Sequence, residues 1–128
     1  MLKALRVALV VYSIAGILVA AMQIFFPTQF ADIYGLDWSS AAAKANAALT
    51  GFVYIAAAIF FIVAATNPLK HLLLVKYAIV FALLLLVGEL YTVALGYVTF
   101  GEEWSGMAIN VVFAALFLIF YPWKKPAN

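Results

Sequence analysis

One acidic residue, Glu89, lies deep inside an apolar stretch of the sequence. The six residues before it, 83–88, are four leucines, a valine and a glycine. An isolated charge in such surroundings is costly, so the carboxyl group must be neutral, paired or in contact with water. A group in this position could recognise a cation, exchange a proton or donate a hydrogen bond, although a neutral structural glutamate is the alternative. Glu89 is therefore the first candidate for a functional residue.

Several other polar side chains interrupt apolar stretches at positions that could bring them near Glu89. A protonated Glu89 could donate a hydrogen bond to an amide side chain, namely that of Gln23, Asn46 or Asn110. Lys44 is the alternative partner, because its long stem lets the ammonium group reach toward water. The candidate ligand-binding residues are Glu89, Asn46, Thr50, Gln23, Thr92, Asn110 and Lys44.

Most other site chemistry is excluded by residue types. The chain has no cysteine, which excludes disulfides, thiolate metal sites and thiol nucleophiles. His71 is its single histidine, so one chain cannot supply a bis-histidine haem site or a histidine metal cluster. No nucleophile–base pair or phosphate loop is present. We therefore expect no catalytic residues, no metal and no cofactor.

The composition places the chain in a lipid environment. Of its 128 residues, 70% are hydrophobic and 9% charged, against roughly 45–50% and 25% in soluble domains. The net charge of +2 comes from basic residues spread over several segments, which does not favour nucleic-acid binding. We expect a single transmembrane domain over residues 1–128.

Four apolar stretches are long enough to cross a bilayer. They cover about residues 4–26, 41–65, 71–97 and 104–121, and a crossing helix needs roughly 20 residues. Each should be a helix, because lipid cannot pair with an open backbone. The sequence thus predicts an all-α membrane protein, a four-transmembrane-helix bundle. Between the first two helices, Thr28 and Gly35 could bound a short helix whose Phe30, Ile33 and Tyr34 lie on the membrane surface.

The charged residues predict an orientation. Basic residues collect at one side of the predicted bundle, and acidic residues at the other, with Lys44 against the trend. Because cytoplasmic loops carry an excess of Lys and Arg, both termini should be cytoplasmic. The basic set is Lys3, Arg6, Lys70, Lys76, Lys124 and Lys125, and the acidic set is Asp32, Asp37, Glu102 and Glu103.

With this orientation, the candidate polar residues share the outer half of the bundle. They continue stripes of small or polar residues at helical spacing, such as Asn46 and Thr50, which should face inward. The inward positions of the inner half are mostly apolar, apart from Ser13. This pattern predicts a polar pocket that opens outward above an apolar plug, although the stripes could serve packing alone.

One segment resembles a known group of proteins. Residues 26–36, with the sequence FPTQFADIYGL, close the first helix and lead into an alanine-rich second helix. This segment resembles that of small bacterial four-helix proteins of the DoxX-like and DUF4345-like groups, and the likeness extends loosely over the chain. Many members carry an arginine in the third helix, where this chain has Gly88 and Glu89. The resemblance implies a place in the bacterial cytoplasmic (inner) membrane, and some relatives are accessory subunits of membrane redox complexes.

Three functions remain open at this point. The first is a non-catalytic accessory or structural subunit of a larger membrane complex, for example in respiratory or photosynthetic electron transfer, or a self-associating bundle. Its partners would be the lipid bilayer and other membrane proteins, in a hetero-complex or a homo-oligomer. The second is binding or transport of a small amphipathic molecule in the outward-facing pocket around Glu89. The third, lipid-modifying catalysis by one carboxylate, rests on analogy of fold alone.

Overall fold

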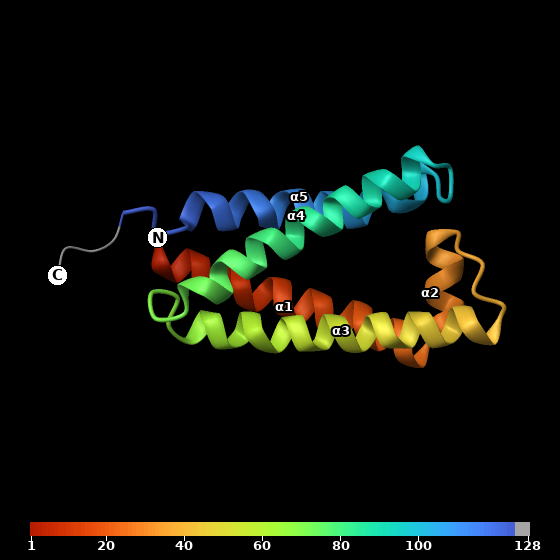
Figure 1. Ribbon diagram of the computed structural model, residues 1–128, viewed down its shortest axis with the longest axis horizontal. Coiled ribbons are helices and arrows are strands. Elements are labelled where there is room, and N and C mark those ends of the chain that lie inside the picture. Colours follow the sequence, from red (N-terminus) through yellow and green to blue (C-terminus); the bar gives the residue numbers. More distant parts are fainter. Residues whose placement is uncertain (125–128) are drawn as a thin grey trace.

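The computed structural model describes residues 1–124 and contains five α-helices and no strand within that range. The helices are α1 (Leu2–Phe25), α2 (Pro27–Tyr34), α3 (Ala41–Thr66), α4 (Leu72–Ala94) and α5 (Phe100–Phe120) (Figure 1). In the described part of the chain, α1, α3, α4 and α5 are long and apolar enough to cross a membrane. The prediction of an all-α chain with four such helices is confirmed, while Lys125 lies outside the described residues.

The last two helices have boundaries that differ from the prediction because of local capping. α4 ends at Ala94, three residues early, where the chain turns through Leu95 and Gly96, whose φ is 73°. α5 begins at Phe100 instead of residue 104. A capping box starts it: the Thr99 hydroxyl accepts from the Glu102 backbone N–H, and the Glu102 carboxylate accepts from that of Thr99. Gly101 therefore lies within the first turn of α5.

The short helix α2 is bounded by two residues suited to its ends. Pro27 is its first residue, where the missing N–H loses no helical hydrogen bond. Gly35 ends it in the left-handed conformation, with φ of 63°. In the following loop Ser39 donates through its hydroxyl and its backbone N–H to Asp37, and these hydrogen bonds hold the pKa of Asp37 below its ordinary value. Ser40 then caps α3 by accepting from the Ala43 N–H, at 3.1 Å.

The four long helices form two closely packed pairs. α1 packs mainly on α3, and α4 mainly on α5, whereas the contacts between the pairs are fewer. The pairs meet at the end that holds the N-terminus and separate toward the end that holds α2 (Figure 1). We call the end where the pairs meet the closed end. The main apolar core fills it and contains Leu5, Leu9, Phe61, Val75 and Phe117. This core corresponds to the apolar plug that the sequence predicts.

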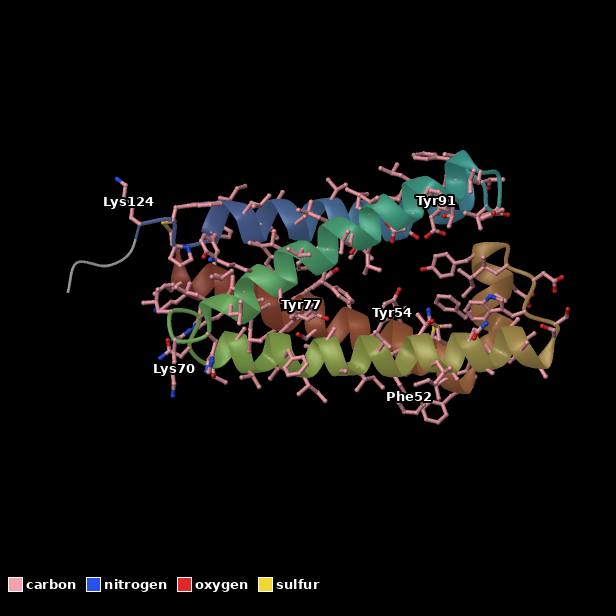
Figure 2. All side chains as sticks on the ribbon, viewed as in Figure 1. Phe52, Tyr54, Lys70, Tyr77, Tyr91 and Lys124 are labelled. Atoms are coloured by element: carbon pink, nitrogen blue, oxygen red, sulfur yellow. The ribbon has the colours of Figure 1, made fainter. Side chains whose placement is uncertain are left out.

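Most basic and most acidic residues lie at opposite ends of the bundle, and large apolar side chains are exposed around its outside. Lys70 and Lys124 lie at the closed end (Figure 2), while Asp32 and Asp37 belong to α2 and its following loop. Large apolar side chains such as Leu18, Phe52, Leu84 and Ile119 are exposed on the outward faces of the long helices. Exposed apolar surface of this extent requires lipid rather than water as its neighbour. The structure is therefore that of a membrane protein.

Gly51 allows the close approach of α3 to α1. A Cβ atom placed on Gly51 would lie 2.8 Å from Ile24 Cγ1 and 3.0 Å from the carbonyl oxygen of Ala20. Ala47 and Ala58 lie on the same buried face of α3. Small residues at such a face let two helix backbones come together, which is how helices associate in lipid. The α1–α3 contact thus depends on the lack of a side chain at position 51.

We expect Gly51→Ala to lower the free energy of unfolding by about 1–3 kcal/mol, the range for overpacking a tight contact. The added methyl would press on the Ala20 backbone, which cannot turn aside as a flexible side chain can. Reversible unfolding in mixed detergent micelles would measure the effect. Gly88→Ala is the matched control, because Gly88 is exposed on α4 and an added Cβ meets no atom within 4 Å. A smaller loss for Gly51→Ala than for Gly88→Ala would contradict this account.

Candidate functional site

A cavity of about 180 Å³ lies between the two helix pairs, beside the apolar core. All five helices contribute to its wall, which is mostly aromatic and aliphatic with a few polar groups. Tyr54 points from α3 toward α4, whereas Phe52, two residues earlier, points away from the bundle (Figure 2). The aromatic residues of the wall are Tyr12, Phe30, Tyr34, Tyr54, Phe61 and Phe81, and the polar ones with amide or carboxyl groups are Gln23, Glu89, Glu103 and Asn110.

A short hydrogen-bond chain links three helices at this cavity. The Tyr12 hydroxyl of α1 donates to Asn110 Oδ1 of α5, at 2.7 Å. Asn110 Nδ2 in turn donates to Glu89 Oε1 of α4, also at 2.7 Å. Tyr12 is held by the core as well, since its ring packs 5.8 Å from that of Phe61 and 5.4 Å from that of Phe117. Asn110 thereby fixes the position of one carboxylate oxygen of Glu89.

Two acceptor atoms at the cavity are left without a hydrogen bond. Within residues 1–124, Gln23 Oε1 and Glu89 Oε2 are buried side-chain atoms that have no hydrogen-bond partner. We call these two atoms the open acceptors. Gln23 is only 6% exposed, and leaving a buried polar group unsatisfied costs about 1–3 kcal/mol. Native folds leave few such groups, so each one calls for an explanation.

A second carboxylate, that of Glu103, faces the same space. Gly106, one turn further along α5, lies close to both acidic side chains. A Cβ atom on Gly106 would lie 3.1 Å from Glu89 Oε1 and 3.6 Å from Glu103 Oε1. Both carboxylates thus reach the same point on α5. Among the described residues, no lysine, arginine or histidine lines the cavity.

Helix α2 covers the end of the cavity away from the core. Phe30 is buried, Tyr34 is half-buried, and both line the cavity. The Phe30 ring packs 4.6 Å from that of Tyr34 and 5.2 Å from that of Trp38 in the following loop. A methyl group on Gly35 would overlap the Glu102 carboxylate, so the end of α2 lies directly against the start of α5. The prediction that Phe30 and Tyr34 lie on the membrane surface is wrong, and of the three only Ile33 is exposed, at 62%.

The structure brings together three of the seven candidate residues: Gln23, Glu89 and Asn110 all line the cavity. Thr92 is half-buried, donates to the Glu89 carbonyl of its own helix, and does not line the cavity. Asn46 and Thr50 are exposed on α3, where the Thr50 hydroxyl donates to the Asn46 carbonyl. They do not face inward, because the alanine and glycine face of α3 packs on α1. Lys44 is exposed, and the partner of Glu89 is Asn110 instead.

Three polar residues of the cavity, Tyr12, Tyr54 and Glu103, are not among the residues predicted from sequence. Two of them carried a usable signal in their spacing. Tyr12 precedes Gln23 by eleven residues, and Glu103 precedes Asn110 by seven, so each shares a helix face with a candidate residue. Tyr54 lay beside the stripe assigned on α3, but that stripe was placed on the wrong face.

The cavity does not resemble a metal centre. Within the described part of the chain, no group of three or more histidine, cysteine, aspartate or glutamate residues is placed to hold a metal ion. What the arrangement offers is a fixed carboxylate, a second carboxylate nearby and a buried amide oxygen, in an aromatic enclosure. Such a set can bind a ligand that supplies hydrogen-bond donors.

No family model, curated protein or solved structure matches this chain. The resemblance to DoxX-like and DUF4345-like proteins therefore stays a prediction. The argument for function rests on the geometry of the cavity.

Proposed function

We propose that this protein binds a small amphipathic molecule in the cavity between its two helix pairs. The observation that carries the proposal is the presence of the open acceptors in a largely aromatic wall. Small-molecule sites in proteins are typically concave and apolar, with a few convergent polar groups that fix the orientation of the ligand. A ligand with a polar end and an apolar body would fit this wall.

The buried polar atoms of the cavity wall carry an energetic cost. The open acceptors are unfavourable for the fold by about 1–3 kcal/mol each, because their hydrogen bonds to water are lost on burial. Packing alone would be better served by apolar side chains at these positions. A ligand that donates to both oxygens would replace the lost hydrogen bonds and stabilise the protein by mass action.

The closed end of the bundle favours binding over conduction. Leu5, Phe61 and Phe117 are almost fully buried there, so packed side chains block passage through this end. In our proposal both termini are cytoplasmic, in a bacterial cytoplasmic membrane, and the mouth of the cavity faces outward. The basic residues at the closed end support this orientation.

A role as an accessory subunit or a self-associating bundle remains compatible with ligand binding. The cavity is internal, so the outward apolar faces of the long helices remain free for lipid or for a membrane partner. Co-purification in a mild detergent, followed by native electrophoresis and mass spectrometry, would test for a stoichiometric partner. Migration as a free monomer would contradict the accessory hypothesis.

Ligand binding is tested with a neutral amphipathic probe, 2-(4-fluorophenyl)ethanol, and ¹⁹F NMR of the protein in phosphatidylcholine nanodiscs. We expect saturable binding above the partitioning seen in empty nanodiscs. Ala15→Leu should abolish the saturable part, because Ala15 lines the cavity and a leucine would fill it. Ala108→Leu is the control, since Ala108 is exposed on α5 and does not line the cavity. Equal binding by both variants, or none by the unmodified protein, would refute the proposal.

A further inference from the structure

We propose that the polar end of the ligand is a primary ammonium group, carried on an apolar body about the size of a phenylethyl group. This inference rests on the proposed function and names the class of molecule that the cavity takes. It is argued in turn from the charge of the wall, from the kind of hydrogen bond that is missing, and from the size and character of the enclosure.

The charged groups of the wall are both acidic. Glu89 and Glu103 line the cavity from α4 and α5, and both reach the same point beside Gly106. Within residues 1–124 no basic side chain lines the cavity to balance them. A cation placed between the two carboxylates would be attracted to both, and in an apolar enclosure this attraction is weakly screened. An anionic ligand would be repelled.

The missing hydrogen bonds are all of one kind. The open acceptors are an amide oxygen and a carboxylate oxygen, and both need a donor. Asn110 Nδ2 donates to Glu89 Oε1, and it donates to neither of the open acceptors. A primary ammonium group has three N–H donors, an alcohol has one, and a quaternary ammonium group has none. Of these three groups, the primary ammonium group alone combines a positive charge with N–H donors for the open acceptors.

The enclosure suits a small aromatic or aliphatic body. Its volume of about 180 Å³ is slightly larger than the ~150 Å³ of an apolar protein cavity that takes benzene. The rings of Tyr12, Tyr54 and Phe81 line it, and aromatic faces also attract cations. A phenylethyl group with its ammonium end beside Glu89 matches both the volume and the chemistry of the wall.

Three probes of similar shape separate the contribution of the positive charge from that of the N–H donors. They are 2-(4-fluorophenyl)ethylamine, its alcohol analogue and its N,N,N-trimethyl analogue, each titrated by ¹⁹F NMR into protein in phosphatidylcholine nanodiscs at neutral pH, where alkylamines are protonated. Empty nanodiscs give the partitioning background. We expect the primary amine to bind at least ten-fold more tightly than the alcohol and at least ten-fold more tightly than the quaternary analogue.

A variant of Glu89 and a control variant test whether Glu89 causes the preference for the amine over the alcohol. Glu89→Gln should reduce the preference for the amine over the alcohol to about three-fold or less, while its Oε1 can still accept from Asn110 and support folding. Asp32→Asn is the control, because it removes one negative charge from the exposed face of α2 and does not line the cavity. Saturable alcohol binding with no preference for the amine would overturn the ammonium inference and leave the proposed function intact. Equal binding of the quaternary and primary amines would overturn the requirement for N–H donors.

Discussion

Replacing Asn110 by leucine is expected to lower the free energy of unfolding by about 2–4 kcal/mol. A single interhelical hydrogen bond in a membrane protein contributes on average only about 0.6 kcal/mol, so the loss of one such bond would change the free energy of unfolding only slightly. Asn110, however, satisfies two groups at once, the Tyr12 hydroxyl and Glu89 Oε1. Its loss leaves both without a partner in the bundle interior, and the cost of unsatisfied groups exceeds the value of the bonds themselves.

Reversible unfolding by SDS in mixed micelles would measure this loss. Asn46→Leu is the matched control, because Asn46 is exposed on α3 and its side chain has no partner among the hydrogen bonds of the described residues. We expect that control to stay within about 0.5 kcal/mol of the unmodified protein. Adding Tyr12→Phe to Asn110→Leu should cost less than Tyr12→Phe alone, because the hydroxyl has already lost its partner. Equal losses for the two asparagine variants would contradict the hydrogen-bond chain.

Replacing Gln23 by leucine is expected to have the opposite effect on stability. The substitution removes a buried oxygen that has no partner within residues 1–124 and puts an apolar side chain of similar size against the wall. The unliganded protein should become more stable by about 1–2 kcal/mol. The same change should weaken binding of the fluorophenylethylamine probe about ten-fold, because one of the open acceptors is gone. A gain in stability together with a loss of affinity is typical of a binding site.

The control for this variant is Gln29→Leu on the exposed face of α2. It should change neither the free energy of unfolding by more than about 0.5 kcal/mol nor the affinity for the probe. Destabilisation by Gln23→Leu would mean that the amide supports the fold, and it would contradict the assignment of Gln23 Oε1 to a ligand.

The four long helices followed from sequence, because the signal for them is local. Apolar length predicted their number and approximate positions. The start of α5 was placed four residues late because its first turn, with Glu102 and Glu103, does not look apolar. The capping box at Thr99 was the signal that could have corrected it.

The site was predicted only in part, because a polar residue does not reveal which side of its helix faces the interior. On α1, α4 and α5 the polar residues Gln23, Glu89 and Asn110 do face the cavity. On α3 the interior belongs to alanine and glycine, and Asn46 points outward. In lipid, close backbone contact competes with hydrogen bonding for the packing face, and on α3 close contact dominates.

The place of α2 could not be predicted from its own sequence. Its alternation of apolar and polar residues indicates one apolar face but does not say whether that face meets lipid or protein. Phe30 and Tyr34 face the protein because Gly35 lets the end of α2 lie against Glu102 of α5. This contact joins residues far apart in the sequence.

The arrangement of two tight helix pairs that meet at one end has a consequence for how ligand specificity could change over evolution. Packed interiors transmit small displacements, because they have little free space to absorb them. Ala64 of α3 and Ala78 of α4 are fully buried in the apolar core of the closed end, and Ala78 precedes Glu89 by eleven residues along α4. A larger or smaller side chain there would alter the angle between the pairs, and the cavity would widen or narrow at the other end. If the proposed function holds, selection for ligand size can act on residues that never touch the ligand, while Glu89 and Gln23 set the chemistry at its polar end.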